Sequence, residues 1–355
     1  MANSPALTAS RRPLAGHGAR VAWTVVGLVL AITAVTFWVS TQIRTEFQNS
    51  YALIPPHQRT YPDHIRHLVV AVTSGTVTIE RASGSATVVD TTGTRASTSP
   101  TDDEHLVGST LYLRSVCGSP GQFQDFCTRD YRVRVPGDVA INASVTTGNL
   151  FISAIHGPVD ATVGTGSISV TGDVGPVHVA TRSGSILVRR EDGALNATTG
   201  TGAVFVAHAR GPVTVDSANG GAVISGASTS VHVTAGTGSV TATGLAGSTF
   251  TGTVMNGNMV LSFTAAPHEV DASTQTGSIT LHVPYADVRY QLHLKTATGR
   301  VVSAIPNTPS STRVIRALAG NGDVILGVGV VPTPSTPQTP TSPGTPVSPT
   351  GPTGG

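Results

Sequence analysis

The sequence has few charged and few aromatic residues, and these shortages exclude several classes of protein. Charged residues make up 11% of the 355 residues, and 21 Lys and Arg nearly balance 19 Asp and Glu. The basic residues are scattered, so the concentrated basic surface of a nucleic-acid-binding protein is absent. The sequence also lacks a P-loop, a nucleophile elbow and an EF-hand loop, and its histidines show no ligand spacing. We therefore expect no catalytic residues, no cofactor, no metal and no nucleic acid partner.

Glycine is abundant instead, and much of it recurs at a fixed spacing. The glycine that opens a short strand returns every 18 residues, and then less regularly. The series is Gly148, Gly166, Gly184, Gly202, Gly220 and Gly238, followed by Gly257, Gly277, Gly299 and Gly322. A second marker, G-P-V at 157–159, 175–177 and 211–213, keeps the same period. Two independent markers with one period indicate a repeat architecture.

Aligning the 18-residue units produces columns of aliphatic residues. Because residues i and i+2 of a strand share a face, each unit directs the apolar side chains of two strand segments to one side. We predict an all-β fold, a β-solenoid (β-helix-like) of about ten coils with successive coils stacked at about 4.8 Å. The columns are Leu150, Ile168, Ile186, Val204, Ala222 and Val240; Ile152, Val170, Val188, Val206, Ile224 and Ala242; Val159, Val177, Leu195, Val213, Val231 and Thr249; and Ala161, Val179, Ala197, Val215, Val233 and Thr251.

Stacked carboxylates are the main candidates for chemistry. The register places Asp173 over Glu191 about 5 Å apart, a separation compatible with a retaining glycosidase pair. It also places Asp160 beside His178. No cluster of Arg, aromatic and acidic groups that would shape a sugar site accompanies these pairs, and surface ladders pair polar residues routinely. A glycan-active enzyme is therefore an alternative, and the main expectation is that the chain is not an enzyme.

One outward column is apolar and is a candidate contact stripe. It consists of Phe151, Leu187, Phe205 and Val223, and Ser169 interrupts it. Either a loop or the N-terminal strands cover this column, or it contacts a partner, because monomers seldom leave apolar ladders uncovered.

The N-terminal region predicts a membrane anchor. Val21 to Ser40 contains no charged residue, and twenty helical residues span roughly 30 Å, the thickness of a bilayer core. Trp23 and Trp38 lie near its ends, and Arg residues precede it, which favours a cytoplasmic N-terminus. A cleaved signal peptide is the competing interpretation. We expect a single-pass protein of the cell membrane with an extracytoplasmic C-terminal domain: a cytoplasmic tail (1–20), a transmembrane helix (21–40), a spacer (41–60), the solenoid (61–331) and a disordered Pro/Thr/Ser-rich tail (332–355).

The chain has two cysteines, Cys117 and Cys127. They would be free thiols in a cytosolic protein, whereas a loop outside the cytoplasm favours a disulfide between them.

These features resemble bacterial adhesin-like domains of the DUF4097 type over roughly residues 65–330. The resemblance rests on V-T-S-G-T-V-T-I-E (72–80), on the cysteine loop leading into Y-R-V-R-V-P (131–136), and on recurring T-G-S-I-x-V units. It implies an extracytoplasmic β-solenoid without established catalytic residues. We expect a membrane-anchored cell-envelope protein that presents its solenoid as a binding or structural surface to an envelope protein or glycan. An envelope-stress accessory acting through a membrane partner is a further alternative.

Overall fold

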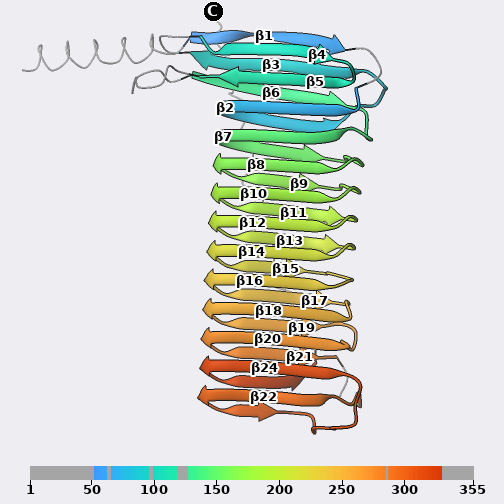
Figure 1. Cartoon of the computed structure of the whole chain (residues 1–355), viewed down its shortest axis with the longest axis vertical. Coiled ribbons are helices and arrows are strands. Elements are labelled where there is room, and N and C mark those ends of the chain that lie inside the picture. Colours follow the sequence, from blue (N-terminus) through green and yellow to red (C-terminus); the bar gives the residue numbers. More distant parts are fainter. Residues whose placement is uncertain (1–51, 62–64, 96–98, 118–126, 285–286, 330–355) are drawn as a thin grey trace, which may run out of the picture.

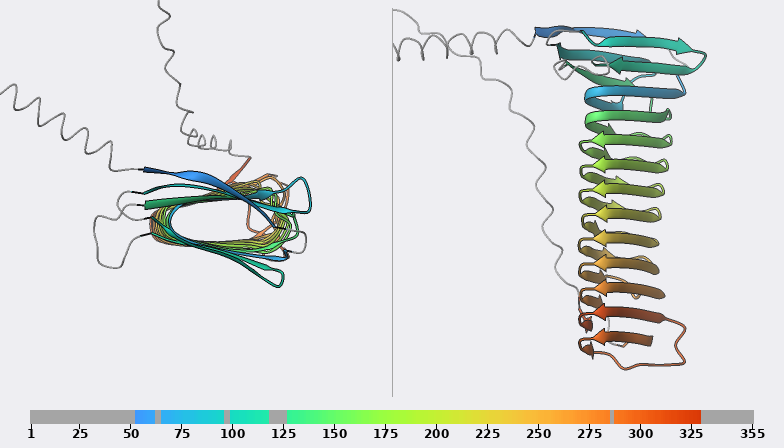
Figure 2. Two further views of the ribbon diagram at one scale, coloured as in Figure 1. Left: turned by 90° about the horizontal axis from the view of Figure 1, so that it is seen from above. Right: turned by 60° about the vertical axis from the view of Figure 1, so that its left-hand side comes forward.

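The molecule is a stack of β-strand coils. The structure, a computed structural model, describes residues 52–61, 65–95, 99–117, 127–284 and 287–329, and every regular element among them is a strand. The coils stack into a tall column (Figure 1) and superpose as a flattened ring when seen along its axis (Figure 2, left). The predicted all-β solenoid is confirmed.

Seven strands form the beginning of the column. They are β1 (Ala52–Tyr61), β2 (His67–Arg81), β3 (Thr87–Arg95), β4 (Thr101–Val107), β5 (Thr110–Val116), β6 (Cys127–Val135) and β7 (Ala140–Ser153).

The regular stack that follows has two faces. The long-strand face contains β8 (Val159–Thr165), β10 (Val177–Ser183), β12 (Leu195–Thr201), β14 (Val213–Asn219), β16 (Val231–Thr237), β18 (Thr249–Asn256) and β20 (Glu269–Thr276). The short-strand face contains β9 (Ile168–Thr171), β11 (Ile186–Glu191), β13 (Val204–Ala209), β15 (Ala222–Ser225), β17 (Val240–Leu245), β19 (Met259–Phe263) and β21 (Ile279–Val283). The last strands are β22 (Gln291–Thr298), β23 (Val301–Ser303), β24 (Val314–Asn321) and β25 (Val324–Val328).

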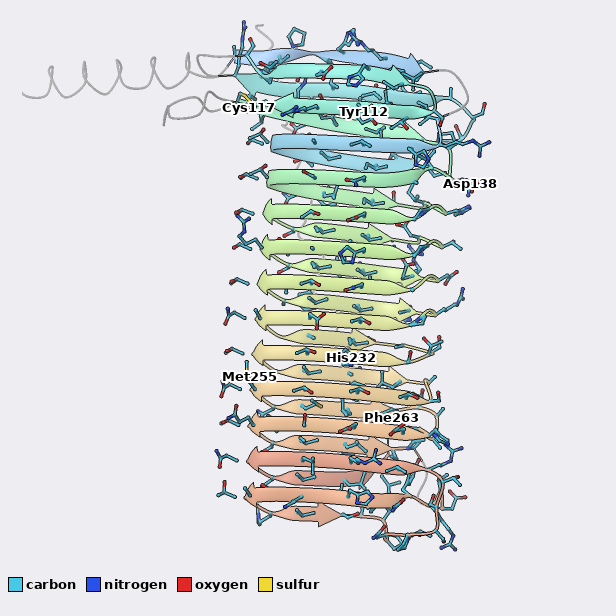
Figure 3. All side chains as sticks on the ribbon, viewed as in Figure 1. Tyr112, Cys117, Asp138, His232, Met255 and Phe263 are labelled. Atoms are coloured by element: carbon cyan, nitrogen blue, oxygen red, sulfur yellow. A yellow bond between two sulfur atoms is a disulfide. The ribbon has the colours of Figure 1, made fainter. Side chains whose placement is uncertain are left out.

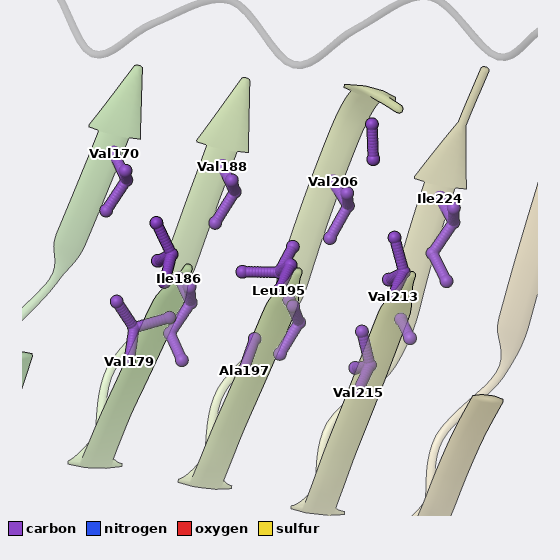
Figure 4. Close-up of a cluster of buried hydrophobic side chains, with 14 of the residues drawn as sticks. Val170, Val179, Ile186, Val188, Leu195, Ala197, Val206, Val213, Val215 and Ile224 are labelled. Carbon is purple, nitrogen blue, oxygen red and sulfur yellow. The ribbon is translucent and has the colours of Figure 1, made fainter. Parts of the chain in front are cut away.

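The regular coils pair in parallel with an offset of 18 residues. On the short-strand face Ile168 pairs with Ile186 and Ile186 with Val204, and on the long-strand face Val159 pairs with Val177. These side chains are buried, and they form aliphatic ladders inside the coil (Figure 4). Each contributes about 1.5–3 kcal/mol before conformational entropy is subtracted. The ladders therefore hold the coils together as a stack.

The register changes once in the regular stack. Val231 pairs with Phe250 and Val233 with Gly252, so the offset becomes 19 residues and the predicted column members Thr249 and Thr251 are wrong. A slip by one residue exchanges the two faces of a strand. It turns the bulky Phe250 into the core, where its ring meets that of Phe263 edge-on at 6.5 Å between centroids.

One edge of every coil turns at a glycine, and we call it the glycine edge. Gly166 has a φ of 137°, and a Cβ there would lie 1.7 Å from the carbonyl oxygen of Gly148 on the preceding coil. Inside this edge, hydroxyls donate hydrogen bonds to glycine carbonyls, as Thr181 Oγ1 does to Gly166 O at 3.3 Å and Thr199 Oγ1 to Gly184 O at 3.1 Å. The repeated glycines are therefore required by both backbone conformation and close packing.

The N-terminal end of the column does not follow chain order. Strand β2 pairs in parallel with β7 on one side and with β5 and β6 on the other, although β3 to β6 lie between β2 and β7 in the sequence. Strand β1 pairs antiparallel with β3, which pairs antiparallel with β6. These strands lie at one end of the column (Figure 1).

The C-terminal end is also out of order. Strand β24 pairs with β20 on one side and with β22 on the other, and β25 likewise lies between β21 and β23. The glycine edge therefore runs from Gly277 to Gly322 and then to Gly299. The predicted glycines all belong to this edge, but their spatial order differs from their sequence order.

The solenoid begins earlier in the chain than predicted. Residues 52–60 were predicted as part of the spacer but belong to β1, because the segment pairs with β3. The predicted cytoplasmic tail, transmembrane helix and C-terminal tail lie outside the described residues. No helix among the described residues is long and apolar enough to cross a membrane.

Candidate functional site

The predicted contact stripe is continuous in the register of the short-strand face. Phe151 pairs with Ser169, and the ladder continues through Leu187, Phe205 and Val223. The side chain of Phe151 is 44% exposed, and the other three apolar members are partly exposed. No described strand covers this face, because the N-terminal strands lie at the end of the column (Figure 1). The stripe is therefore open to a partner.

The stripe also extends further than the sequence indicated. From Val223 the ladder runs through Thr241, Val260 and Thr280 and then reaches Ile325 and Val302. Ile325 is 36% exposed and Val302 is 52% exposed. Sequence spacing could not find these last members, because β25 precedes β23 in space. The whole ladder from Phe151 to Val302 contains no charged residue, and we call it the apolar stripe.

The long-strand face is polar in the same position. Its outward ladder contains Asp160, His178, Asn196, Thr214 and His232, and the side chain of His232 is visible on this face in Figure 3. Asp160 and His178 are register partners, as predicted.

An open groove of about 850 Å³ runs over the turns that lead into the long-strand face. Pro158, Pro176 and Pro212 line it, and each proline directly precedes a strand, as predicted. Few polar groups converge in the groove, so it offers shape more than specific recognition.

The carboxylates predicted to stack do so inside the coil. Asp173 and Glu191 are both 0% exposed, in a column that contains Ile155 before them and Ala209 and Leu245 after them. Asp173 Oδ1 accepts a hydrogen bond from the Ile155 amide at 2.9 Å, and Glu191 Oε1 accepts one from the Gly193 amide at 3.0 Å. The second oxygen of each carboxyl group has no hydrogen-bond partner in the described structure.

Burial raises the pKa values of both carboxyl groups. The pKa of Asp173 rises to about 6, and that of Glu191 rises to about 8 because desolvation is reinforced by the negative charge of Asp173. The prediction that these residues form a surface pair is wrong. Their inward position follows from the turn after the short strand, which directs them towards the core. A buried pair cannot contact a polymeric substrate, so the glycan-active alternative loses its proposed residues.

The edge opposite the glycine edge also has left-handed backbone, and we call it the corner column. Its members are Ala154, Gly172, Arg190, His208, Gly226 and Gly244, with φ values of 58°, 73°, 55°, 59°, 70° and 66°. This edge is the one on which Asp138 is labelled in Figure 3. A left-handed conformation costs about 1–2 kcal/mol at a residue other than glycine. Two adjacent coils therefore place long polar side chains at a strained position.

A small polar pocket lies at this edge. It has a volume of about 470 Å³, and its lining includes Arg190, Asp192, His208, Arg210 and Ser228. Arg210 Nη1 lies 3.1 Å from Asp192 Oδ1 and 3.2 Å from Oδ2. The pocket was not predicted from the sequence, although the 18-residue alignment places Arg190 and His208 in a column that also contains three glycines.

The predicted disulfide between Cys117 and Cys127 is present. It joins the end of β5 to the start of β6 at the N-terminal end of the column (Figure 3). In the described part of the chain, no three or more His, Cys, Asp or Glu side chains gather as metal ligands would.

Comparisons with known proteins reach only the level of fold. No protein-family model matches the sequence, and no curated protein is significantly similar to it. Among solved structures, a "putative cell adhesion protein" of Clostridium sporogenes is 8% identical, with 77% of this chain and 100% of that chain covered and a TM-score of 0.18. A "putative adhesin" of Parabacteroides distasonis is 11% identical (78% and 97% covered, TM-score 0.34), and one of Bacteroides fragilis is 12% identical (77% and 97%, TM-score 0.28).

These neighbours are named as adhesins, in agreement with the resemblance noted in the sequence. The DUF4097 family itself is not shown, since no family model matches. The identities and TM-scores are too low to support an argument about function, which rests on the surfaces described above.

Proposed function

We propose that this chain is a membrane-anchored protein of the cell envelope whose solenoid acts as a rigid, adhesin-like binding surface. The apolar stripe is the contact surface for a partner, and the predicted helix Val21–Ser40 is the anchor. In this proposal the N-terminus is cytoplasmic and the solenoid is extracytoplasmic.

The observation that carries the proposal is the contrast between the two outer faces. Phe151, Leu187, Phe205 and Val223 form an uncovered ladder on one face, whereas the equivalent ladder on the other face is polar. Burial of apolar surface contributes about 25 cal/mol per Å², so a flat partner that covered this ladder would gain affinity from it. A stacked solenoid also keeps its surface rigid without the partner, which reduces the entropy lost on binding.

The test combines two substitutions in the stripe. Phe151→Ser with Phe205→Ser should weaken the capture of partners from envelope fractions, or self-association of the chain, by at least about tenfold. Both side chains point outwards, so the circular dichroism spectrum and the unfolding midpoint should change little.

A matched control places the same number of changes on the other face. His178→Ser with His232→Ser should leave capture and self-association unchanged. Equal loss in both double variants, or no loss in either, would contradict the assignment of the stripe as the contact surface.

The anchor is tested separately. The full chain should remain with the membrane fraction after alkaline carbonate washing and should be released by detergent. Release by carbonate alone would contradict the anchor without affecting the proposal for the stripe.

A further inference from the structure

The polar pocket at the corner column brings positive charge together on adjacent coils. Arg190 and Arg210 both line it, and His208 lies between them in the sequence and also lines it. Asp192 is the only acidic residue that the structure describes in the lining. The side chain of Arg190 has no hydrogen bond or ion pair with any described residue, so its donors are available.

The backbone at this pocket is strained where the basic side chains are attached. Arg190 and His208 have φ values of 55° and 59°, while the equivalent positions on neighbouring coils are Gly172 and Gly226. Left-handed backbone at residues other than glycine concentrates at functional sites, where side chains are kept despite their conformational cost. Ala154 shows that the corner accepts a Cβ, so its geometry does not prevent substitution.

The surroundings favour a bound anion. The guanidinium group of Arg210 is shared with Asp192 through one nitrogen, Nη1, which leaves its other donors unused by this pair. Nδ1 of His208 lies 3.2 Å from where a Cβ on Gly226 would be, so the glycine leaves room for the imidazole ring. Glu191 lies beneath the pocket, and burial raises its pKa to about 8, which reduces the negative charge close to Arg190 at neutral pH.

We propose that Arg190, His208 and Arg210 form a binding site for a phosphate-type oxyanion at the corner of the solenoid. Arg binds such groups through two parallel hydrogen bonds, and two arginines with a histidine on stacked coils can surround one tetrahedral group. The site is separate from the apolar stripe and does not depend on it. The bound group is either a free ion or a phosphate ester on a larger molecule.

The experiment is a ³¹P NMR titration of the full chain with inorganic phosphate and with methyl phosphate, at constant ionic strength adjusted with NaCl. Saturable binding of both would indicate that the site accepts an ester, and saturable binding of phosphate alone would indicate a site for the free ion. Either result supports the proposal, and the absence of saturable binding of both would overturn it.

Variants decide whether the pocket is responsible. Arg190→Gly introduces the residue that the neighbouring coils use, so the fold should remain intact while affinity falls by about tenfold, the loss expected for charge-assisted hydrogen bonds. Asp192→Asn removes the carboxylate that competes for Arg210 and should tighten binding.

Arg300→Gln is the matched control, because it removes one exposed positive charge at a distant coil. Its side chain is 83% exposed and lies 3.6 Å from Asp323. Affinity in this variant should equal that of the unchanged chain. If Arg190→Gly and Arg300→Gln weaken binding equally, the effect reflects net charge, and the proposed site is wrong.

Discussion

The two edges of each coil turn the chain in different ways. At the glycine edge, a Cβ on Gly184 would lie 1.8 Å from the carbonyl oxygen of Gly166, so consecutive coils leave no room for a side chain. At the corner column, a Cβ on Gly172 would meet no atom within 4 Å, although the backbone is left-handed there as well. Backbone conformation alone therefore does not require glycine in this fold.

The difference explains where the molecule varies. The glycine edge is occupied by glycine in every regular coil, because close packing and conformation act together. The corner column contains alanine, arginine and histidine as well as glycine, because only a conformational cost must be met. Polar side chains can thus be attached to the stack at the corner column without breaking it.

The largest expected effect comes from filling the glycine edge. Gly184→Ala should lower the free energy of unfolding by about 4 kcal/mol or more, because the new Cβ collides with backbone that cannot move without separating two coils. Chemical denaturation followed by circular dichroism measures the loss. A change below about 1 kcal/mol would show that neighbouring coils can separate easily, contrary to the packing described.

The second effect concerns the buried carboxyl groups just inside the corner column. Their pKa values in the folded state, about 6 for Asp173 and about 8 for Glu191, exceed the usual values near 4 of an unfolded chain. The folded state therefore holds more protons, and stability should be highest below about pH 4 and fall by about 2–4 kcal/mol as the pH rises through 8. Urea denaturation across this pH range measures the slope.

Glu191→Leu should remove much of that slope and raise stability at pH 8, because Leu245 already occupies the equivalent position in another coil. Asp160→Asn on the outer face is the matched control and should leave the slope unchanged. If the Glu191→Leu variant keeps the full pH dependence, the assignment of the slope to this pair is wrong.

The smallest effect comes from the corner column itself. Gly172→Ala should cost only about 1 kcal/mol, the conformational cost of left-handed backbone, because Ala154 is already accommodated at the equivalent position. The same denaturation experiment compares it with Gly184→Ala. Equal losses in the two variants would remove the distinction between the edges.

Much of the fold could be predicted from local patterns. The 18-residue spacing of the glycines, the aliphatic ladders such as Ile168, Ile186 and Val204, and the strand-initiating prolines all agree with the structure. The stripe from Phe151 to Val223 could be predicted for the same reason, since alternation assigns each residue of a strand to a face. The extension of the stripe to Ile325 and Val302 could not, because it depends on which coil lies last.

The sequence by itself determined the repeat, the strand faces and the positions of the turns, because these depend on residues close together in the chain. Only the tertiary structure decided that β24 lies between β20 and β22, that Phe250 replaces Thr249 in the core, and that Asp173 and Glu191 point inwards. It also decided which edge has space for a Cβ. These features depend on distances between neighbouring coils, which no pattern within a single repeat contains.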